Sequence, residues 1–307
     1  MFSQSFGHYL LNHGLITREQ LTDALEFQKS VHVRFGVIAV DEGYMMPAQV
    51  EEVHMKQKQV DKRFGEIATE LGYLTDKQVE TLVSKQKQNH LFLAQALVDR
   101  EYMTIDQFGA ALNDFKNAYS LSDDQFEAIK SGNIETLVEK FLDTQGAEKK
   151  VIYGKYLSLF AKHLIRFVDD QVYLEVAAQM LPRHANWFVH QEIIGESPLF
   201  TAIAANEEVF LHIASQFAEE KLTEVDELAK ASVCEFLNLT NGVYLVNMSN
   251  WGIELTMKPQ AALESALVDG ESFVVTVNTS KGAFQLLLSD QPERISIEPK
   301  IKSEQTV

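Results

Sequence analysis

Residues 64–79 read FGEIATELGYLTDKQV, and this pattern recurs through the first third of the chain. The related stretches are FGHYLLNHGLITREQL from Phe6, FGVIAVDEGYMMPAQV from Phe35 and LAQALVDREYMTIDQF from Leu93. The starting residues are 29 residues apart each time, and the alignment needs no insertion. A fixed period of this size indicates one supersecondary unit used four times. Such arrays are more typical of interaction or sensing than of catalysis.

Within each copy, the spacing of apolar residues predicts two short helices. In the first copy Gly14 ends the first helix in a left-handed conformation, and Thr17 with Gln20 forms a capping box at the start of the second helix. The corresponding helix starts in the other copies are Thr75 with Gln78, Thr104 with Gln107, and Pro47. We therefore predict an all-α helical repeat domain over residues 1–118.

The motif Arg-Phe-Gly, followed by a Gly seven residues later and a Gln in the next helix, resembles the N-terminal domain of type II secretion and type IV pilus ATPases. In some of these relatives, called MshEN domains, two such motifs bind cyclic di-GMP. Guanidinium groups pair with phosphates, and glycines let the backbone approach a ligand closely. A simpler interpretation is that the glycines only end helices and the arginines are solvated. The resemblance implies a ligand site at Arg34, Gly36, Gly43, Arg63, Gly65 and Gly72.

The composition, with 46% apolar and 23% charged residues in 307, predicts a globular protein of about two domains. The net charge of −17 is uneven: residues 1–120 carry 12 Lys and Arg against 16 Asp and Glu, and the remainder carries 15 against 28. The acidic second half argues against nucleic acid and anionic lipid as partners. No apolar run approaches about 18 residues and no signal peptide is recognisable, so we expect a cytoplasmic protein without membrane insertion.

Residues 151–300 are predicted to form an α+β domain with helices packed on an antiparallel sheet. The expected helices are 153–168, 206–217 and 223–237. The expected strands are 171–177, 187–194, 252–257, 272–277 and 283–288, the last two forming a hairpin. Residues 119–150 are predicted to be a helical linker with short helices at 125–130 and 134–142, and residues 301–307 a tail.

One segment of this domain, LAKASVCEFLNLTNG from Leu228, carries a chemical signal. Glu235 and Asn238 are three residues apart, so they project from one face of a helix whose other residues are mostly apolar. A carboxylate and an amide in such a setting need a specific role. Cys234 is a sole cysteine and is expected to be a buried small hydrophobe, and the nine histidines show no metal-ligand spacing.

The motif Glu-x-x-Asn with a Gly four residues later resembles that of the CheC/CheX-type chemotaxis phosphatases. The resemblance implies that Glu235 pairs with the active-site Lys of a phosphorylated response-regulator receiver domain. It implies that Asn238 holds a water in line with the aspartyl phosphate. The enzyme would bring no cofactor of its own, because the receiver supplies Mg²⁺. The helix at 153–168 has no Glu-x-x-Asn, which favours the single-site CheX type, some of whose members pair as homodimers through a sheet edge.

We therefore predict a bacterial two-component signalling protein, in which a helical repeat module sets the location or activity of a CheX-like phosphatase domain. The competing hypothesis is non-enzymatic. In that case the chain is a scaffold or a cyclic di-GMP-binding adaptor that docks a receiver domain or the secretion or pilus machinery. The sequence contains no Walker loop, GxSxG motif or GxGxxG motif, which argues against an ATPase.

Overall fold

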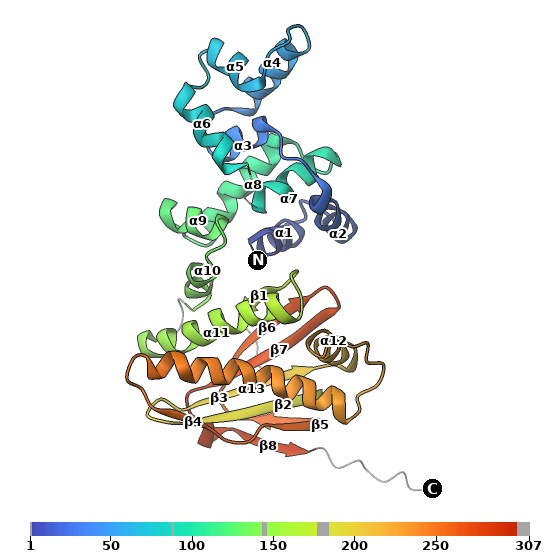
Figure 1. Cartoon of the computed structure of the whole chain (residues 1–307), viewed down its shortest axis with the longest axis vertical. Coiled ribbons are helices and arrows are strands. Elements are labelled where there is room, and N and C mark those ends of the chain that lie inside the picture. The colour runs from blue at the N-terminus through green and yellow to red at the C-terminus, as the bar shows by residue number, and fades with distance from the viewer. Residues whose placement is uncertain (1, 87–88, 143–145, 177–183, 300–307) are drawn as a thin grey trace. The chain divides into compact units, whose positions relative to one another are not determined.

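The computed structural model describes residues 2–86, 89–142, 146–176 and 184–299 (Figure 1). The chain divides into two compact units, an N-terminal unit of residues 2–133 and a C-terminal unit that begins at Ile134. Among the described residues, every regular element of the N-terminal unit is a helix, whereas the C-terminal unit combines helices with one antiparallel sheet.

The N-terminal unit contains short helices joined by tight turns. They are α1 (Phe2–Asn12), α2 (Arg18–Phe27), η1 (Gln28–Ser30), α3 (Phe35–Asp41), α4 (Pro47–Gln57), α5 (Phe64–Glu70), α6 (Asp76–Lys85), α7 (Asn89–Asp99), α8 (Ile105–Ala118) and α9 (Asp123–Lys130). The capping boxes predicted at Thr17, Thr75 and Thr104 are present, each with a Gln three residues later. These side chains satisfy backbone N–H groups that the first turn of a helix leaves unpaired.

The turn that ends the first helix of each 29-residue stretch has the same backbone conformation in all four. Gly14, Gly43 and Gly72 have φ of +66°, +68° and +74°, and Glu101 has φ of +58° at the corresponding place. Only glycine adopts this left-handed region without steric cost. The fourth stretch therefore keeps the turn although it has lost the glycine.

The leading glycine of the first three stretches lies where one helix contacts the next. A Cβ atom would lie 2.6 Å from Leu21 Cδ1 at Gly7, 2.5 Å from Val50 Cγ1 at Gly36, and 3.0 Å from a Val79 methyl group at Gly65. The distances at Gly7 and Gly36 are too short for a real Cβ contact, and the distance at Gly65 is tighter than most such contacts. The absence of a side chain thus lets the two helices of each stretch pack closely.

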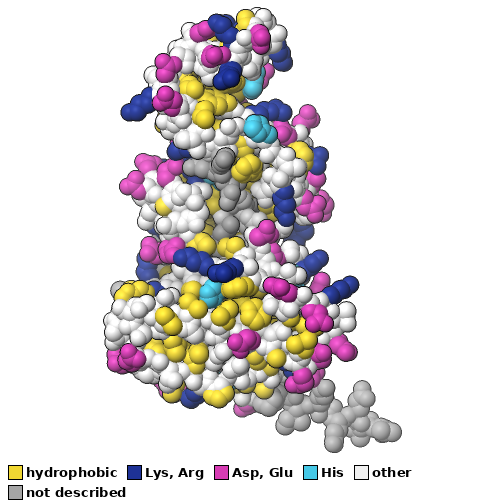
Figure 2. Space-filling model, viewed as in Figure 1, with side chains coloured by type: hydrophobic (Ala, Val, Ile, Leu, Met, Phe, Trp, Pro, Cys, Tyr) yellow, Lys and Arg dark blue, Asp and Glu magenta, His cyan; other side chains and the backbone are white. Residues whose placement is uncertain are grey.

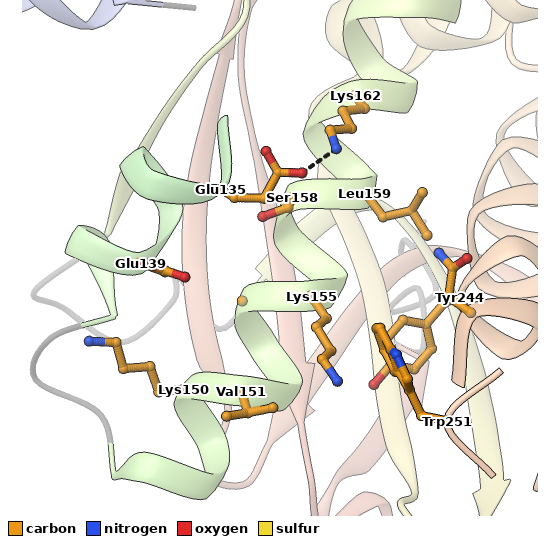
Figure 3. Close-up of a pocket in the computed structure, with 12 residues that line it drawn as sticks. Glu135, Glu139, Lys150, Val151, Lys155, Ser158, Leu159, Lys162, Tyr244 and Trp251 are labelled. Carbon is orange, nitrogen blue, oxygen red and sulfur yellow. Dashed lines mark hydrogen bonds and ion pairs between the residues drawn. The ribbon is translucent and has the colours of Figure 1, made fainter. Parts of the chain in front are cut away.

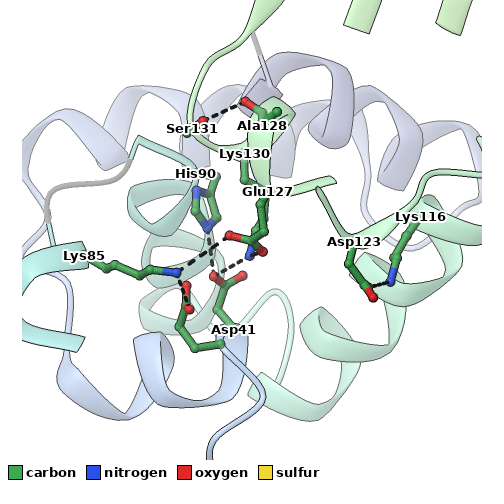
Figure 4. A network of polar contacts seen from close by, with 10 residues as sticks. Asp41, Lys85, His90, Lys116, Asp123, Glu127, Ala128, Lys130 and Ser131 are labelled. Atoms are coloured by element: carbon green, nitrogen blue, oxygen red, sulfur yellow. Dashed lines mark hydrogen bonds and ion pairs between the residues drawn. The ribbon is translucent and has the colours of Figure 1, made fainter. Parts of the chain in front are cut away.

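The segment expected to be a linker is shared between the two units. Helix α9 belongs to the N-terminal unit, because the Lys130 side chain is 1% exposed and its Nζ lies 3.0 Å from Asp41 Oδ2. His90 Nε2 lies 2.9 Å from the same Asp41 oxygen. Helices α3, α7 and α9 therefore meet at this buried carboxylate (Figure 4). Helix α10 (Ile134–Phe141) instead packs on α11 (Ala147–Phe167) in the C-terminal unit. The boundary lies between residues 133 and 134.

The sheet of the C-terminal unit is antiparallel throughout, in the order β1-β6-β7-β3-β2-β5-β8, with β4 paired to β2. Its strands are β1 (Tyr173–Val176), β2 (His184–Gly195), β3 (Leu199–Ala205), β4 (Leu255–Met257), β5 (Ala261–Asp269), β6 (Phe273–Thr279), β7 (Gly282–Ser289) and β8 (Ser296–Pro299). A short helix η2 (Pro292–Arg294) precedes β8.

Helices α11, α12 (Glu207–Phe217) and α13 (Glu227–Ser249) lie on one face of this sheet (Figure 1). The core between the layers contains Phe160 from α11, Phe210 from α12 and Phe236 from α13, each fully buried, against strand residues such as Ile203 and Leu286. Burial of large apolar side chains is the main stabilising term in such a two-layer unit. The α+β arrangement of helices on an antiparallel sheet agrees with the sequence prediction.

The β6–β7 hairpin is confirmed, with Thr279 opposite Gly282. The sequence did not indicate β3, β5 or β8, and it ended the helix that begins near residue 223 too early. Helix α13 continues to Ser249, because residues of turn-forming type such as Asn241 point into the core and are hydrogen-bonded there. Within the described ranges, none of the helices combines the length and apolar character needed to cross a membrane.

Candidate functional site

Glu235 and Asn238 lie next to each other on α13. Glu235 is exposed and Asn238 is half-buried. Asn238 Nδ2 donates a hydrogen bond of 3.3 Å to Glu235 Oε2, so the predicted pair does share one face of the helix. This contact joins the carboxylate and the amide into one polar group at the surface.

The helix that carries this pair is fixed by its cap and by its apolar stripe. Asp226 caps the start of α13 by accepting a hydrogen bond from the Ala229 N–H at 2.9 Å. Val233, Phe236 and Leu237 are fully buried against the other helices and the sheet. Because buried positions recur at helical spacing on one side, Glu235 is left on the opposite side.

Asn238 is held from behind by Gln191 of β2, a side chain that is 1% exposed. Gln191 Nε2 donates to Asn238 Oδ1 at 2.9 Å and to the Lys258 carbonyl oxygen at 2.9 Å. A carbonyl oxygen only accepts, so the Lys258 contact requires Gln191 to present its NH₂ group on this side. Asn238 must then turn its oxygen toward Gln191. Its Nδ2 group consequently lies on the outer side, beside Glu235.

A second layer of buried polar groups fixes Gln191. Asn241 Nδ2 donates to Gln191 Oε1 at 2.8 Å and to Thr201 Oγ1 at 2.9 Å. Tyr156 donates its hydroxyl hydrogen to Asn241 Oδ1 at 2.6 Å. Asn241, Thr201 and Tyr156 are fully buried. Buried hydrogen-bond networks in which each partner is satisfied rigidify the groups they contain. The network therefore links the sheet, α11 and α13 to the amide of Asn238.

The side of α13 that carries Glu235 also exposes apolar side chains. On the same side of α13, Leu228 is 46% exposed and Val246 is 62% exposed, and Ala231 is also exposed. Figure 2, in the view of Figure 1, shows hydrophobic side chains gathered over the region of α13. Exposed apolar surface that surrounds a few polar groups is typical of protein interaction sites.

Gly242 lies one turn after Asn238 on this side of α13 and is half-buried. A Cβ atom at this position would meet only Met257 Cε, at 3.9 Å, which is an ordinary contact. Glycine in the middle of a helix is unfavourable by about 0.5–1 kcal/mol relative to alanine. Packing within the described part of the chain therefore does not account for this glycine.

Cys234 precedes Glu235 but faces the interior. The residue is 9% exposed. Burial, with a smaller contribution from the negative charge of Glu235, raises the pKa of the Cys234 thiol to about 11. A thiol with so high a pKa is a poor nucleophile at neutral pH. This agrees with the expectation that Cys234 is a small hydrophobic residue.

The glycines proposed for a ligand in the N-terminal unit have different environments. Gly36 is buried and Gly65 is half-buried, where helices pack closely. Gly43 and Gly72 are exposed and have positive φ, with no atom within 4 Å of a virtual Cβ. Each glycine thus has a conformational or packing reason to be glycine, independent of any ligand.

The two arginines of the same prediction also differ. Arg34 is tied to α7, since its guanidinium lies 3.0 Å from Asp99 Oδ1 and its N–H donates to Gln95 Oε1 at 2.8 Å. Arg63 is exposed, and no ion pair of its guanidinium occurs within the described ranges. The helices that follow them, α3 and α5, touch through Phe35 and Phe64, whose ring centroids are 5.8 Å apart.

Sequence reasoning did not identify Gln191, Asn241, Thr201 or Tyr156. Gln191 stands between His190 and Glu192, so it looks like part of a polar strand segment. Asn241 falls in a Thr-Asn-Gly run that suggests a turn. A buried amide network depends on side chains that are distant in sequence, so no local sequence pattern predicts it. In the described ranges, no cluster of three or more His, Cys, Asp or Glu side chains has the arrangement of a metal site.

No protein-family model and no curated protein sequence matches this chain. Several solved structures are similar to it over its C-terminal part. The chemotaxis protein CheX from Vibrio vulnificus matches with a TM-score of 0.40 and 11% identity, over 45% of this chain and 97% of CheX. A CheC-like superfamily protein from Shewanella sp. PV-4 matches with a TM-score of 0.38 and 15% identity, over 45% and 97%.

A third similar structure is the complex of CheX with CheY, BeF₃ and Mg²⁺ from Borrelia burgdorferi. It matches with a TM-score of 0.36 and 14% identity, over 48% of this chain and 97% of the matched chain. These matches leave the N-terminal unit uncovered.

Proposed function

We propose that the C-terminal unit removes the phosphoryl group from the aspartyl phosphate of a response-regulator receiver domain. The observation that carries the proposal is the Glu235–Asn238 pair at the surface of α13, whose amide is oriented by Gln191. The motif that contains this pair resembles that of the CheC/CheX-type phosphatases. Receiver domains act inside the cell, so this function would place the protein in the cytoplasm.

The docking surface in this proposal is the outer side of α13. Leu228, Ala231 and Val246 offer apolar area on both sides of the polar pair. Gly242 would let the partner backbone approach the helix one turn from Asn238. This would explain why a glycine stands in the middle of the helix. A partner of this kind binds through a small apolar patch and is positioned by the polar pair.

The proposed reaction transfers the phosphoryl group to water. A water oxygen attacks phosphorus, the bond from phosphorus to the aspartyl oxygen breaks, and the products are the free aspartate and inorganic phosphate. The outward Nδ2 group of Asn238 has a second hydrogen that it can donate to a water oxygen, so Asn238 is suited to hold that water in line. Glu235 would pair with the receiver's Lys, and the receiver's own Mg²⁺ would neutralise the developing charge.

The alternative function is a non-catalytic adaptor, with cyclic di-GMP bound by the N-terminal unit. The exposed guanidinium of Arg63 at the start of α5 favours it, because an arginine with no carboxylate partner among the described residues can pair with a phosphate. Arg34 would have to leave Asp99 to contribute. In this case the outer side of α13 would only dock a partner, such as a receiver or the secretion or pilus machinery.

The test is the decay of phosphorylated receiver domains from the source organism, measured with the full chain and with Asn238→Ala. We expect the full chain to accelerate the decay of one receiver and Asn238→Ala to lose at least about 100-fold of this acceleration. Asn250→Ala, which changes an exposed asparagine at the end of the same helix, serves as the control. Unchanged decay across the panel would reject the phosphatase function.

The adaptor function is tested by titrating cyclic di-GMP into the full chain by calorimetry. Saturable binding that is lost in Arg63→Ala and retained in Lys62→Ala would support it. Absence of heat at about millimolar ligand would reject nucleotide binding. A receiver that binds Asn238→Ala as tightly as the unmodified chain would show that docking survives without catalysis.

A further inference from the structure

A cavity of about 570 Å³ opens in the C-terminal unit between α10, α11 and the end of α13 (Figure 3). Its size is in the range of pockets that hold small ligands. Neither Glu235 nor Asn238 lines it. The residues that matter for its chemistry are Lys155, Tyr244, Trp251, Val151, Leu159 and Asn247.

The hydroxyl group of Tyr244 is a buried donor that finds no acceptor among the described residues. Tyr244 is 1% exposed, and its hydroxyl has no hydrogen-bond partner in the described structure. Burial raises the pKa of Tyr244 to about 12, so the hydroxyl keeps its hydrogen at neutral pH. A buried hydroxyl without a partner is unfavourable, and nearly all such groups in native proteins are satisfied. Tyr244 lines the cavity, so an acceptor in the cavity would satisfy it.

Lys155 is a second donor, and it has no anionic partner in the part of the chain that the structure describes. Its Nζ lies 3.2 Å from the centroid of the Trp251 ring, and no carboxylate pairs with it within the described ranges. Burial lowers the pKa of Lys155. In the view of Figure 3, Lys155 and Tyr244 both point toward the Trp251 side of the cavity.

The charge of the cavity differs from that of the chain. The chain has a net charge of −17, yet the cavity is lined by Lys150, Lys155 and Lys162 against Glu135 and Glu139. Glu135 is already paired with Lys162 at its edge. The remaining wall is apolar, since Val151 is 55% exposed, Trp251 is 55% exposed and Leu159 is half-buried. Positive charge beside exposed apolar and aromatic surface is suited to an anion with an apolar body.

We propose that this cavity is a binding site for a small organic anion. A carboxylate or phosphate oxygen of the ligand would accept hydrogen bonds from Tyr244 Oη and Lys155 Nζ. Its apolar body would lie against Leu159, Val151 and the Trp251 ring. This site is independent of the phosphatase function, because it needs neither Glu235 nor Asn238.

The site is nevertheless connected to the surface pair through α13 and the buried network. The Tyr244 ring contacts the Tyr156 ring edge to face, with centroids 5.3 Å apart. Tyr156 in turn donates to Asn241, which holds Gln191 behind Asn238. A ligand that engages Tyr244 therefore contacts the same packed group of side chains that orients Asn238.

The experiment uses the fluorescence of Trp251 in a Trp187→Phe chain, in which Trp251 is the only tryptophan. The probes are phenylacetate, phenyl phosphate, acetate and inorganic phosphate, each titrated to about 10 mM. We expect phenylacetate or phenyl phosphate to give a saturable change, and acetate and inorganic phosphate to bind at least about tenfold more weakly. The difference between the two aromatic probes assigns the anion as carboxylate or phosphate.

Tyr244→Phe keeps the ring and removes only the hydroxyl, and Lys155→Gln removes the charge of a half-buried residue. Each should weaken binding of the better probe by about tenfold or more, whereas Lys281→Gln, outside the cavity, should not change it. Far-ultraviolet circular dichroism establishes that each variant is folded. The proposal is overturned if no probe saturates, or if both Tyr244→Phe and Lys155→Gln bind as the parent chain does.

Discussion

Gln191 of β2 donates a 2.9 Å hydrogen bond to Asn238 of α13, and this bond decides which way the Asn238 amide faces. The direction follows from the Lys258 carbonyl oxygen, 2.9 Å from the same Gln191 nitrogen, because that oxygen can only accept. An exposed amide is normally free to turn over. Here the surface residue is oriented by a buried one from another layer of the fold.

We predict that Gln191→Met lowers turnover in the proposed phosphatase reaction by about tenfold or more, because Asn238 loses the donor that orients it. The substitution also leaves the buried Nδ2 of Asn241 with one acceptor fewer, so the free energy of unfolding should fall by about 1–3 kcal/mol. Turnover is measured as phosphate release from a phosphorylated receiver, with kcat and KM determined separately.

Gln285→Met is the control, since Gln285 is a half-buried glutamine on β7 of the same sheet. A purely structural role for Gln191 would lower stability and leave kcat of the folded protein unchanged. That result would contradict the positioning of Asn238 by Gln191.

The parts of the fold that sequence predicted are those with a local signal. Thr75 with Gln78 forms a capping box from residues three apart, and the β6–β7 hairpin follows from alternation around a short turn. Strand β3 gave no such signal, because all of its residues are buried and no alternation is visible. Strand β5 reads AALESALVD, a composition that favours a helix. The segment is nevertheless a strand because it pairs with β2.

The candidate site was predictable only in its outer layer. Glu235 and Asn238 lie three residues apart in a helix, so their shared face follows from the helical repeat. The residues that hold Asn238 come from β2, β3 and α11, and their contacts arise only when these elements pack. The environment of Arg34 was equally hidden, since Asp99 lies on a different helix.

We predict that Gly36→Ala destabilises the N-terminal unit by about 1–3 kcal/mol, because its Cβ would lie 2.5 Å from Val50 Cγ1 in a packed core. Gly109→Ala in α8 is the matched control. Its Cβ would lie 3.7 Å from the nearest atom, so alanine should be neutral or stabilise by up to about 1 kcal/mol.

The measurement is urea unfolding followed by far-ultraviolet circular dichroism. If the clash is the cause, the double variant Gly36→Ala, Val50→Ala should recover part of the loss caused by the two single changes. Equal stability of Gly36→Ala and Gly109→Ala would show that close helix packing is not the reason for glycine at position 36.

The Asp169 carboxylate joins α12 and the β6–β7 hairpin to the end of α11. It accepts hydrogen bonds from the Ser280 hydroxyl at 2.6 Å and from the Gln171 N–H at 2.7 Å, and His212 Nε2 lies 3.2 Å away. Burial alone would raise the pKa of Asp169, but these hydrogen bonds outweigh it and hold the pKa well below its usual range. The ionised form is therefore favoured by folding.

We predict that Asp169→Asn lowers the free energy of unfolding by about 1.5–3 kcal/mol at pH 7. A depressed folded-state pKa gives stability that is present above the unfolded pKa of about 4 and is lost as pH falls below it. The difference from the unmodified chain should therefore shrink below about pH 4. This difference in the free energy of unfolding is measured by tryptophan fluorescence during urea unfolding, because both tryptophans lie in the C-terminal unit. Asp170→Asn, at an exposed neighbour, should show no such pH-dependent loss.

We predict that Cys234 reacts slowly with iodoacetamide in the native protein. Its pKa of about 11 is two units above the ordinary value of 9.0, so the thiolate fraction at pH 8 is about 100-fold lower than for a free thiol. Mass spectrometry of the alkylated chain, with and without urea, measures the difference. Rapid native labelling would show that the thiol is accessible and would reopen a nucleophilic role.

The buried charges at Asp41 provide the sharpest stability test in the N-terminal unit. The Asp41 side chain is 0% exposed and Lys130 is 1% exposed, with 3.0 Å between Oδ2 and Nζ (Figure 4). Burial alone would raise the pKa of Asp41 and lower that of Lys130. The hydrogen bond from His90 and the charge of Lys130 reverse the first shift, and the charge of Asp41 reverses the second.

We predict that Lys130→Met destabilises the N-terminal unit by about 3–5 kcal/mol, because it leaves a buried carboxylate without its cation. Lys116→Met, which breaks the ion pair with the 91% exposed Asp123 in the same unit, should cost no more than about 1 kcal/mol. The double variant Asp41→Asn, Lys130→Met should lose less than Lys130→Met alone, since no uncompensated charge remains. Circular dichroism should detect the lower stability of the N-terminal unit. The unfolding transition of the C-terminal unit, followed by tryptophan fluorescence, should not shift. If Lys130→Met and Lys116→Met lowered the free energy of unfolding equally, water would have to reach Asp41. The Lys130–Asp41 ion pair would then not stabilise the packing of α9 on the rest of the N-terminal unit.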